Sequence, residues 1–421
     1  MRVALLLLAL FLPVFSGCER AAPRATAPLQ QDAYVWQRAQ TPAVNEAVQT
    51  RARAFHSLVV LAAEVSWKKS GAQLAPQIAR VTPDWSAWRA VPRLGLALRI
   101  NAYPGPFARD DATIGAFTAL ARAILTEAAA HRVTVAEFQV DFDAATAKLP
   151  GYLVWINTLR AAVAPVPLTV TALPAWLRSS DFSALAHTAP NYVLQVHALA
   201  HPREADQSVT LCDPDAARAA IARAARLNVP FRVALPTYGY TLTFDSSGHY
   251  AGVSAEGPHA EHSNGAIVHE IRADTAQLST LVRSLMADRP AALTGLIWYR
   301  LPVAGDQLNW AWPTLAAVMN GRTPPPHLRT AVQVREDGSL EFTLFNDGDG
   351  DFTGPVRAVA RWRNARRTGA DALGPFVLVG EDPGSLHLAA PACSLPAGTH
   401  RVIGRLRLSD PNSFPEIFLE N

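Results

Sequence analysis

The stretch that decides the fold runs from His131 to Arg160 and reads HRVTVAEFQVDFDAATAKLPGYLVWINTLR. Its first half alternates between apolar and polar side chains, as a β-strand does. Glu137, Gln139, Asp141 and Asp143 all fall on one side of that strand, because side chains two residues apart point the same way. A strand that is apolar on one face and acidic or amidic on the other fits the inner wall of a barrel, with Asp141 and Asp143 at its open mouth.

Seven further apolar runs flank this strand, and helical patterns or long connections separate them. Apolar residues recur at helical spacing over 111–131, and a DPD cap opens a second helix over 214–227. Eight strands alternating with helices predict a parallel sheet, and eight is the number that closes a (β/α)8 barrel, here over 32–322. The seven other strands begin at Ala33, Ser57, Pro92, Pro167, Tyr192, Phe231 and Ala292.

The character of the sequence changes after a last barrel helix that Gly321 ends. The segment 323–330 is rich in proline and predicts a stiff linker. From 331 to 421, short alternating runs are separated by Gly, Asp and Pro turns, which predicts a small antiparallel β-sandwich.

The N-terminus reads MRVALLLLALFLPVFSGC, with a basic start and an apolar core too short for a membrane span. This pattern predicts a signal peptide over 1–17. FSGC resembles the bacterial lipobox, so we expect Cys18 to be lipidated, with 18–31 as a tether; plain secretion is the alternative. Glu19 suits the outer membrane of a Gram-negative cell, so the expected location is the periplasmic face of that membrane.

Charge narrows the class of partner. The chain has 421 residues and a net charge of +3 from 38 Lys and Arg against 35 Asp and Glu. These charges are scattered without a basic run, so we expect no nucleic-acid partner. We expect a monomer that needs no cofactor.

Asp141 and Asp143 are the leading candidates for chemistry. Two carboxylates close together do not both ionise easily, so the pKa of one rises and a general acid becomes available near neutral pH. A structural interpretation stays open, in which Asp143 caps the next helix and Asp141 ties down a loop.

The segment QVDFDAATAKLPGYLVWINTLR resembles the Asp-x-Asp-x-Glu strand and following helix of the family 18 chitinase-like glycoside hydrolases. VALPTYGY and GLIWYRLP resemble that superfamily's seventh and eighth strands. The pattern from lipobox through barrel to sandwich is similar to the bacterial family called domain of unknown function 3142, whose name carries no activity. The resemblance implies that Asp143 is the proton donor and that Asp141 orients it, or orients an acetamido group of the substrate.

Two positions depart from the glycosidase motif. Gln139 stands where its first Asp is expected, and Asp143 stands where its terminal Glu is expected. An Asp side chain reaches about 1.5 Å less far, and catalytic positions tolerate an error of only about 1 Å. The site is therefore either rebuilt around another acid or binds sugars without cutting them.

Further residues at strand ends are candidates for binding substrate alongside Gln139. Glu64 is either a second carboxylate in the cleft or a structural partner of Arg99. Gln195 and His197 occupy the position of a sugar-lining pair in the chitinase-like pattern, and the alternative for His197 is a structural histidine at the barrel rim. Flat rings at strand ends can stack on sugars or fill the core; these are Trp36, Tyr238, Trp298 and Tyr299.

Two apparent metal motifs do not meet the requirements of a site. His259, His262 and His269 lie in a long connection without helical spacing, which favours a solvated segment. The run NDGDGDFTG lacks the glycine and the final acid of a calcium loop, so a tight hairpin turn is the prediction.

The leading hypothesis is a lipid-anchored glycoside hydrolase that uses Asp141 and Asp143. The alternative is a non-catalytic barrel that binds a glycan or an envelope partner, and the missing terminal Glu is its main support. A metal-dependent deacetylase is a third class, but it needs a His/Asp ligand set that the sequence does not supply.

Overall fold

The computed structural model describes residues 23–70, 73–109, 111–198, 202–254 and 265–420. Cys18, the predicted lipid attachment site, lies outside these residues. No helix in the described ranges is long and apolar enough to cross a membrane.

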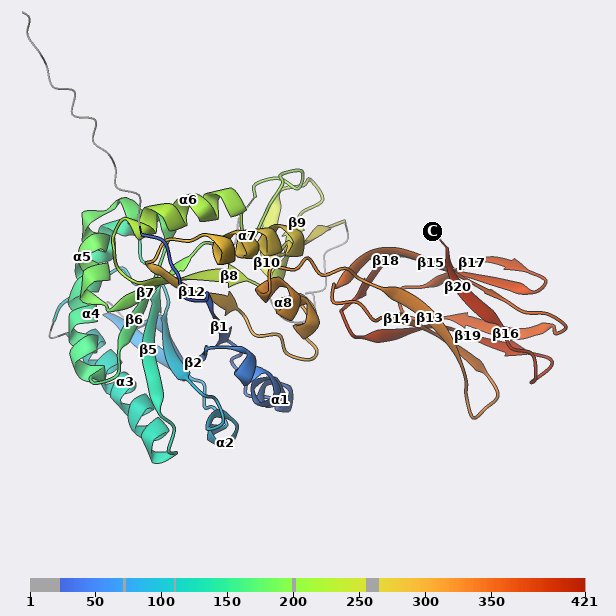
Figure 1. Cartoon of the computed structure of the whole chain (residues 1–421), viewed down its shortest axis with the longest axis horizontal. Helices are drawn as coiled ribbons and strands as arrows, with labels where there is room; N and C mark the ends of the chain where they lie inside the picture. The colour runs from blue at the N-terminus through green and yellow to red at the C-terminus, as the bar shows by residue number, and fades with distance from the viewer. Residues whose placement is uncertain (1–22, 71–72, 110, 199–201, 255–264, 421) are drawn as a thin grey trace, which may run out of the picture.

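Eight parallel strands close into a barrel, which confirms the predicted (β/α)8 fold (Figure 1). Each strand pairs in parallel with the next, and β12 pairs with β1 to complete the ring. All eight predicted runs supply barrel strands: β1 (Gln30–Val35), β2 (Ser57–Ser70), β4 (Leu94–Ile100), β5 (Val135–Phe142), β6 (Leu168–Ala172), β7 (Asn191–Gln195), β8 (Phe231–Pro236) and β12 (Leu293–Tyr299).

Helices surround the barrel, and both predicted helices are confirmed by α3 and α6. Asp111 and Asp213 cap these two helices by accepting hydrogen bonds from backbone N–H groups of the first turn. The α-helices are α1 (Pro42–Arg51), α2 (Trp85–Trp88), α3 (Ala112–Ala130), α4 (Leu149–Val163), α5 (Ser180–Thr188), α6 (Pro214–Ala225), α7 (Thr275–Ala287) and α8 (Trp312–Met319), and the 3-10 turns are η1 (Ala52–Ala54), η2 (Thr146–Lys148) and η3 (Pro174–Arg178).

Strand β5 buries apolar side chains on one face and polar side chains on the other. On β5 the outward side chains Phe138, Val140 and Phe142 join the large apolar core between strands and helices. The inward side chains of the same strand are Glu137, Gln139 and Asp141, all buried. The alternation read in the sequence is therefore the alternation between helix-facing and barrel-facing positions.

Four strands beside the barrel were not predicted. Strand β3 (Gln73–Arg80) pairs antiparallel with β2 and extends the sheet beyond the ring. Between β8 and α7, a three-stranded antiparallel sheet forms a wing in the order β10-β9-β11. Its strands are β9 (Gly239–Phe244), β10 (Tyr250–Ser254) and β11 (Ile267–Arg272).

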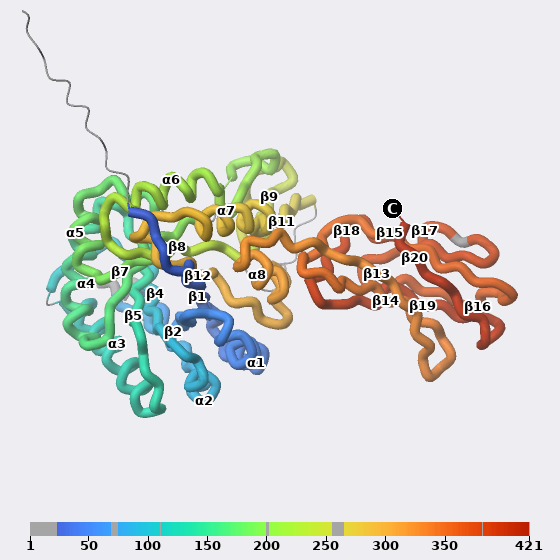
Figure 2. Tube along the Cα trace, viewed as in Figure 1, coloured from blue at the N-terminus to red at the C-terminus, as the bar shows by residue number. Residues whose placement is uncertain are grey.

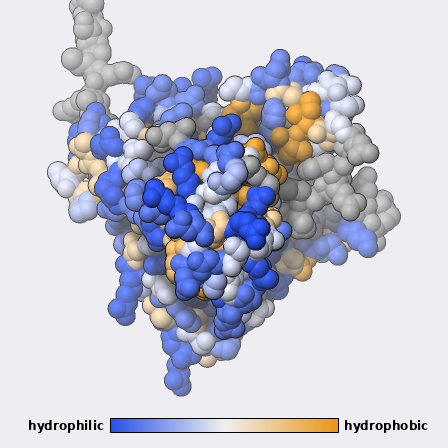
Figure 3. All heavy atoms as spheres, turned by 90° about the vertical axis from the view of Figure 1, so that its right-hand side faces the viewer, coloured by the Kyte–Doolittle hydropathy of each residue, from blue (hydrophilic) through white to orange (hydrophobic). Residues whose placement is uncertain are grey.

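The C-terminal region forms two four-stranded antiparallel sheets around their own core, as a β-sandwich does (Figure 2). The sheets have the orders β13-β14-β19-β16 and β17-β18-β15-β20. Viewed from the sandwich end, hydrophilic side chains cover much of the surface (Figure 3). The strands are β13 (Leu328–Val334), β14 (Leu340–Asn346), β15 (Phe352–Arg361), β16 (Arg367–Ala372), β17 (Val377–Asp382), β18 (Ser385–Leu395), β19 (His400–Leu408) and β20 (Glu416–Glu420).

The prediction of a hairpin at NDGDGDFTG is wrong. Strand β14 pairs with β13 and β19, whereas β15 pairs with β18 and β20, so the loop 347–351 crosses between the two sheets. The loop packs against the proline-rich segment, because a Cβ on Gly350 would lie 2.3 Å from the Pro324 carbonyl oxygen. The Gly350 N–H also donates to the Pro325 carbonyl at 3.0 Å.

Asp351, in this loop, joins the sandwich to the last barrel helix. Its carboxylate accepts from the Ala311 N–H at 3.2 Å and from Thr314 Oγ1 at 3.1 Å, at the start of α8. It also accepts from the Ala397 N–H in the sandwich, at 2.9 Å. No side chain of α8 or of its own cap residue caps this helix, so the sandwich supplies a partner for its N-terminal end.

We expect Asp351→Ala to lower the free energy of unfolding by about 1–2 kcal/mol, because two hydrogen bonds at a helix start and one in the sandwich are lost. Thermal unfolding of the full chain measures this change. Asp349→Asn is the control, because the side chain of Asp349 forms an exposed ion pair with Arg322, such pairs contribute little, and the substitution keeps the backbone carbonyl that accepts from Thr314. Equal, small effects of the two substitutions would show that Asp351 does not tie the sandwich to α8.

Candidate functional site

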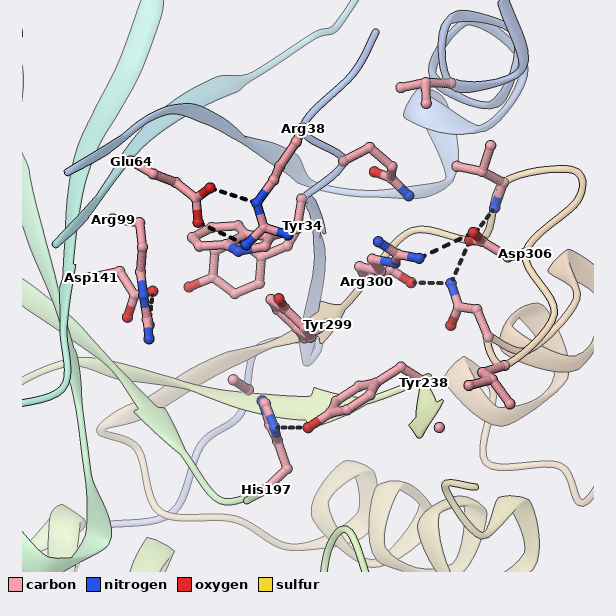
Figure 4. Close-up of a pocket in the computed structure, with 18 of the residues that line it drawn as sticks. Tyr34, Arg38, Glu64, Arg99, Asp141, His197, Tyr238, Tyr299, Arg300 and Asp306 are labelled. Carbon is pink, nitrogen blue, oxygen red and sulfur yellow. Dashed lines mark hydrogen bonds and ion pairs between the residues drawn. The ribbon is translucent and has the colours of Figure 1, made fainter. Parts of the chain in front are cut away.

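A cavity of about 1070 Å³ opens at the C-terminal ends of the barrel strands. This is the end at which parallel barrels carry their working groups. Figure 4 shows aromatic rings, three arginines and several carboxylates around it, from strands that lie far apart in the sequence. Its polar and aromatic lining includes Tyr34, Trp36, Arg38, Glu64, Arg99, Asp141, Asp143, Thr171, Gln195, His197, Tyr238, Tyr299, Arg300, Asp306 and Asn309.

Asp141 is held at the floor of the cavity by three donors. Thr171 Oγ1 donates to its Oδ1 at 2.7 Å and Gln195 Nε2 donates to the same atom at 3.1 Å. Arg99 Nη1 donates to Oδ2 at 2.5 Å. The carboxylate is 3% exposed, so its position is fixed by β6, β7 and β4 together.

Asp143 lies at the lip, just beyond the end of β5, with 40% of its side chain exposed. Arg99 Nη2 donates to its Oδ2 at 2.9 Å, so a single guanidinium bridges both aspartates. Burial raises the pKa of Asp143 and the charge of Asp141 raises it further, whereas Arg99 lowers it; the balance is a raised pKa. Both carboxylates raise the pKa of Arg99 against the effect of burial, so Arg99 stays charged.

Glu64 faces the cavity but does not pair with Arg99. Its carboxylate accepts from Arg38 Nε at 2.5 Å and from Arg38 Nη2 at 2.9 Å. The structural alternative that paired Glu64 with Arg99 is therefore wrong. The two residues are neighbours in the register of β2 and β4, but Arg99 turns to the aspartates of β5.

His197 and the aromatic side chains form one wall. His197 stacks on Tyr299 with ring centroids 5.6 Å apart, and its Nδ1 lies 3.3 Å from the Tyr238 hydroxyl. Burial lowers the pKa of His197 to about 4, so the imidazole is neutral at physiological pH. Trp36 packs against Tyr299 at 5.6 Å and continues the wall across the end of β1.

Two predicted site residues do not line the cavity. Trp298 is fully buried in the core between strands and helices, where its Nε1 donates to Gln31 Oε1 at 2.7 Å. Its neighbour Tyr299 faces the cavity, and adjacent residues of a strand point to opposite sides. Gln139 is also fully buried and accepts from the Tyr34 hydroxyl at 2.8 Å, so it supports the floor from below.

The arginines were missed as parts of the site. The sequence pattern suggests Arg99 only as a structural partner of Glu64 and indicates no role for Arg38 or Arg300. A signal was present in the sequence for Arg99, which lies two residues after the barrel-facing Ala97 on its strand. Its register beside Asp141 on β5 is visible only in the fold.

The described residues include no group of three or more metal-ligating side chains that could hold an ion. His269 lies on β11 against the Phe244 ring. His259 and His262 lie outside the described residues.

Among solved structures, the chain resembles a chitinase from Chromobacterium violaceum at 15% identity, covering 70% of this chain and 98% of that one, with a TM-score of 0.46. It also resembles the Bacillus cereus spore cortex-lytic enzyme SleL at 14% identity, covering 70% and 74%, with a TM-score of 0.47. A chitinase from Bacillus thuringiensis matches at 9% identity over 93% and 100%, with a TM-score of 0.47. These similarities give no information beyond the barrel fold, which the strand pairing already defines.

A comparison with curated protein sequences finds no match. A family model described as a domain of unknown function (DUF3142) matches residues 98–304. This range holds both aspartates, Arg99, His197 and the ends of the last six barrel strands. Residues 98–304 of the barrel therefore resemble this domain family.

Proposed function

We propose that the cavity is the active site of a glycoside hydrolase in which Asp143 donates the proton to the leaving oxygen. The observation that carries the proposal is the carboxyl of Asp143 at the lip of the cavity, half-exposed, with a raised pKa. A general acid needs a proton near neutral pH and access to the substrate, and this environment favours both.

Asp141, which is held in place by three donors, acts on the proton donor Asp143 through its charge. Its two oxygens are occupied by Thr171, Gln195 and Arg99, which leaves it poorly placed to contact substrate. Its charge helps to raise the pKa of Asp143, and its contact with Arg99 fixes the guanidinium between the two carboxylates.

The aromatic wall supports a carbohydrate as the substrate. Trp36, Tyr238 and Tyr299 line the cavity beside polar groups that can hydrogen-bond hydroxyls. A largely apolar, aromatic pocket with a few fixed polar groups is the usual form of a small-molecule site. Because the outer-membrane location is expected from the leader alone, a glycan of the cell envelope is the first substrate class to test.

Non-catalytic glycan binding is the second candidate function. The observation in its favour is Arg99, which pairs with both aspartates at once and so opposes the protonation of Asp143. In that case the two carboxylates and Arg99 would form a fixed polar floor beneath a bound sugar.

A panel of fluorescently labelled oligosaccharides, with and without N-acetyl groups, tests the proposal. We expect the parent protein to release shorter products from at least one member, resolved by chromatography. Binding of a panel member without any product, at high protein concentration and across pH 4–8 (about the range in which carboxylic acid catalysts work), would replace the hydrolase by the binding barrel.

A further inference from the structure

A β-bulge in β2 delivers Glu64 into the cavity. Val59 and Leu61 face the barrel interior, so strict alternation would place Ala63 inward and Glu64 outward. The register with β4 shifts between Leu61 and Ala63. The extra residue reverses which of the following side chains face the barrel interior. Glu64 therefore faces the cavity. Bulges beside functional sites commonly re-aim a side chain in this way.

The re-aimed carboxylate holds Arg38 across the cavity mouth. Two parallel hydrogen bonds, at 2.5 and 2.9 Å, fix the guanidinium in one plane. The side chain of Arg38 is nevertheless 63% exposed, whereas that of Glu64 is 16% exposed. Within the described part of the chain, Arg38 Nη1 has no hydrogen-bond acceptor. The result is a rigid cation that keeps donors for a ligand.

A second guanidinium lines the same cavity from the other side. Arg300 follows β12 and is 8% exposed, and its Nη2 contacts Asp306 at 3.1 Å. Burial lowers the pKa of Arg300, Asp306 partly offsets this effect, and the like charge of Arg38 lowers the pKa further. Figure 4 shows Arg38 and Arg300 above the Tyr299 ring, with Glu64 and Asp306 on their outer sides.

The neighbouring acids are already engaged. Glu64 is bidentate on Arg38, and Asp306 accepts from Arg300, from Asn309 Nδ2 and from the Val303 N–H. Both carboxylates already accept from these donors, so a group that enters beside Arg38 meets the exposed guanidinium of Arg38 and the positive charge of Arg300. A planar carboxylate matches the fork of a guanidinium.

We propose that Arg38 and Arg300 form a subsite for a carboxylate carried by the glycan, with Glu64 as the residue that positions Arg38. The inference rests on the proposed function in that the ligand is a glycan, and it narrows the substrate class to acidic sugars. It does not require that the glycan is cut.

Calorimetric binding to two matched pairs of probes tests the subsite. The first pair is trigalacturonate and its methyl ester, which differ only in the ring carboxylates. The second is N-acetylglucosaminyl-N-acetylmuramic acid and diacetylchitobiose, which differ in the lactyl ether group that carries the carboxylate. We expect the charged member of at least one pair to bind about tenfold more tightly than its neutral partner. The pair that discriminates identifies the source of the carboxylate.

Arg38→Gln should remove this preference while leaving the affinity for the neutral member unchanged. Glu64→Gln should weaken the preference in the same direction, because Arg38 then loses its fixed orientation. Arg218→Gln is the matched control, since Arg218 forms an ion pair with Asp215 on α6 and does not line the cavity. It should leave both affinities as they are.

Three outcomes would overturn the subsite. They are equal affinity within both pairs, absence of binding by both charged probes, and a preference for the charged member that survives Arg38→Gln. These outcomes are distinct from a failure of the hydrolase. Cleavage of a neutral glycan without any charge preference removes only the subsite, whereas a charge preference without cleavage of any glycan removes only the hydrolase.

Discussion

Asp143→Asn should abolish most turnover while the protein keeps its fold. An amide of the same shape cannot donate the proton to the leaving oxygen, and general acid catalysis contributes about 10²–10⁴-fold to the rate. The melting temperature should be unchanged, because the side chain is half-exposed at the lip and Arg99 keeps its contact with Asp141. Initial rates on the best oligosaccharide of the panel measure the loss.

The pH profile of the parent follows from the same environment. The acid works in its protonated form, so the rate should fall as pH rises through the pKa of Asp143, which is raised. Asp141→Asn removes the negative charge that helps to raise this pKa. The alkaline side of the profile should therefore move to lower pH in that variant, in addition to any loss of rate.

Asp215→Asn on α6 is the control for removing an exposed carboxylate, and it should leave the rate and the profile unchanged. Hydrolysis that survives Asp143→Asn undiminished would exclude Asp143 as the proton donor. Glu64, another carboxylate that faces the cavity, would then be the next residue to substitute.

The barrel could be predicted because its strands carry two independent signals. Apolar runs such as Leu94–Ile100 recur between helical segments, and the inward face of β5 is polar throughout. The wing and β3 could not be predicted in the same way. They lie beyond the ring as antiparallel additions, and β10 has alternating half-exposed side chains without an apolar face.

The sequence indicates those candidate site residues whose direction follows from the alternation of side chains along one strand. It does not indicate the residues that reach the cavity through strand pairing or through a β-bulge. Asp141 and Asp143 follow from alternation along one strand. Trp298 and Tyr299 are both predicted to face the cavity, although two adjacent strand residues cannot share a face. Glu64 reaches the cavity only through a bulge that the sequence does not mark. Arg99 reaches the aspartates only through the pairing of β4 with β5.

Arg232→Met should destabilise the barrel more than any other single change discussed above. Arg232 is buried near the start of β8, at the end of the barrel opposite the cavity. Its Nη1 contacts Asp32 at 2.7 Å and Glu137 at 2.9 Å, and its Nη2 contacts Glu137 at 2.6 Å. Without the guanidinium, the buried carboxylates of Asp32 and Glu137 lose the cation that they share, and only the half-exposed His56 still contacts Asp32. Breaking such a buried network costs about 3–5 kcal/mol at neutral pH.

The loss of stability caused by Arg232→Met should become smaller as the pH falls. In the parent, burial raises the pKa of Asp32, but hydrogen bonds from His56 and Arg232 and the charge of Arg232 outweigh it, so the pKa is lowered. A carboxylate with a lowered pKa stabilises the fold fully above its unfolded pKa of about 3.9 and loses that contribution only below it. Between pH 7 and pH 5 this contribution in the parent is therefore constant.

In Arg232→Met, burial and the facing carboxylate remain while the cation is gone, so the pKa of the pair should be raised. The folded variant then takes up a proton before the unfolded chain does, and its stability should increase as pH falls from 7 to 5. Urea unfolding of parent and variant at both pH values measures the difference.

The triple variant Asp32→Asn, Glu137→Gln, Arg232→Met is the control. It leaves no unpaired charge in this network, so it should recover much of the loss at pH 7. A loss below about 1 kcal/mol at pH 7, or one that is the same at both pH values, would mean that water reaches the carboxylates and that the network does not hold the barrel closed.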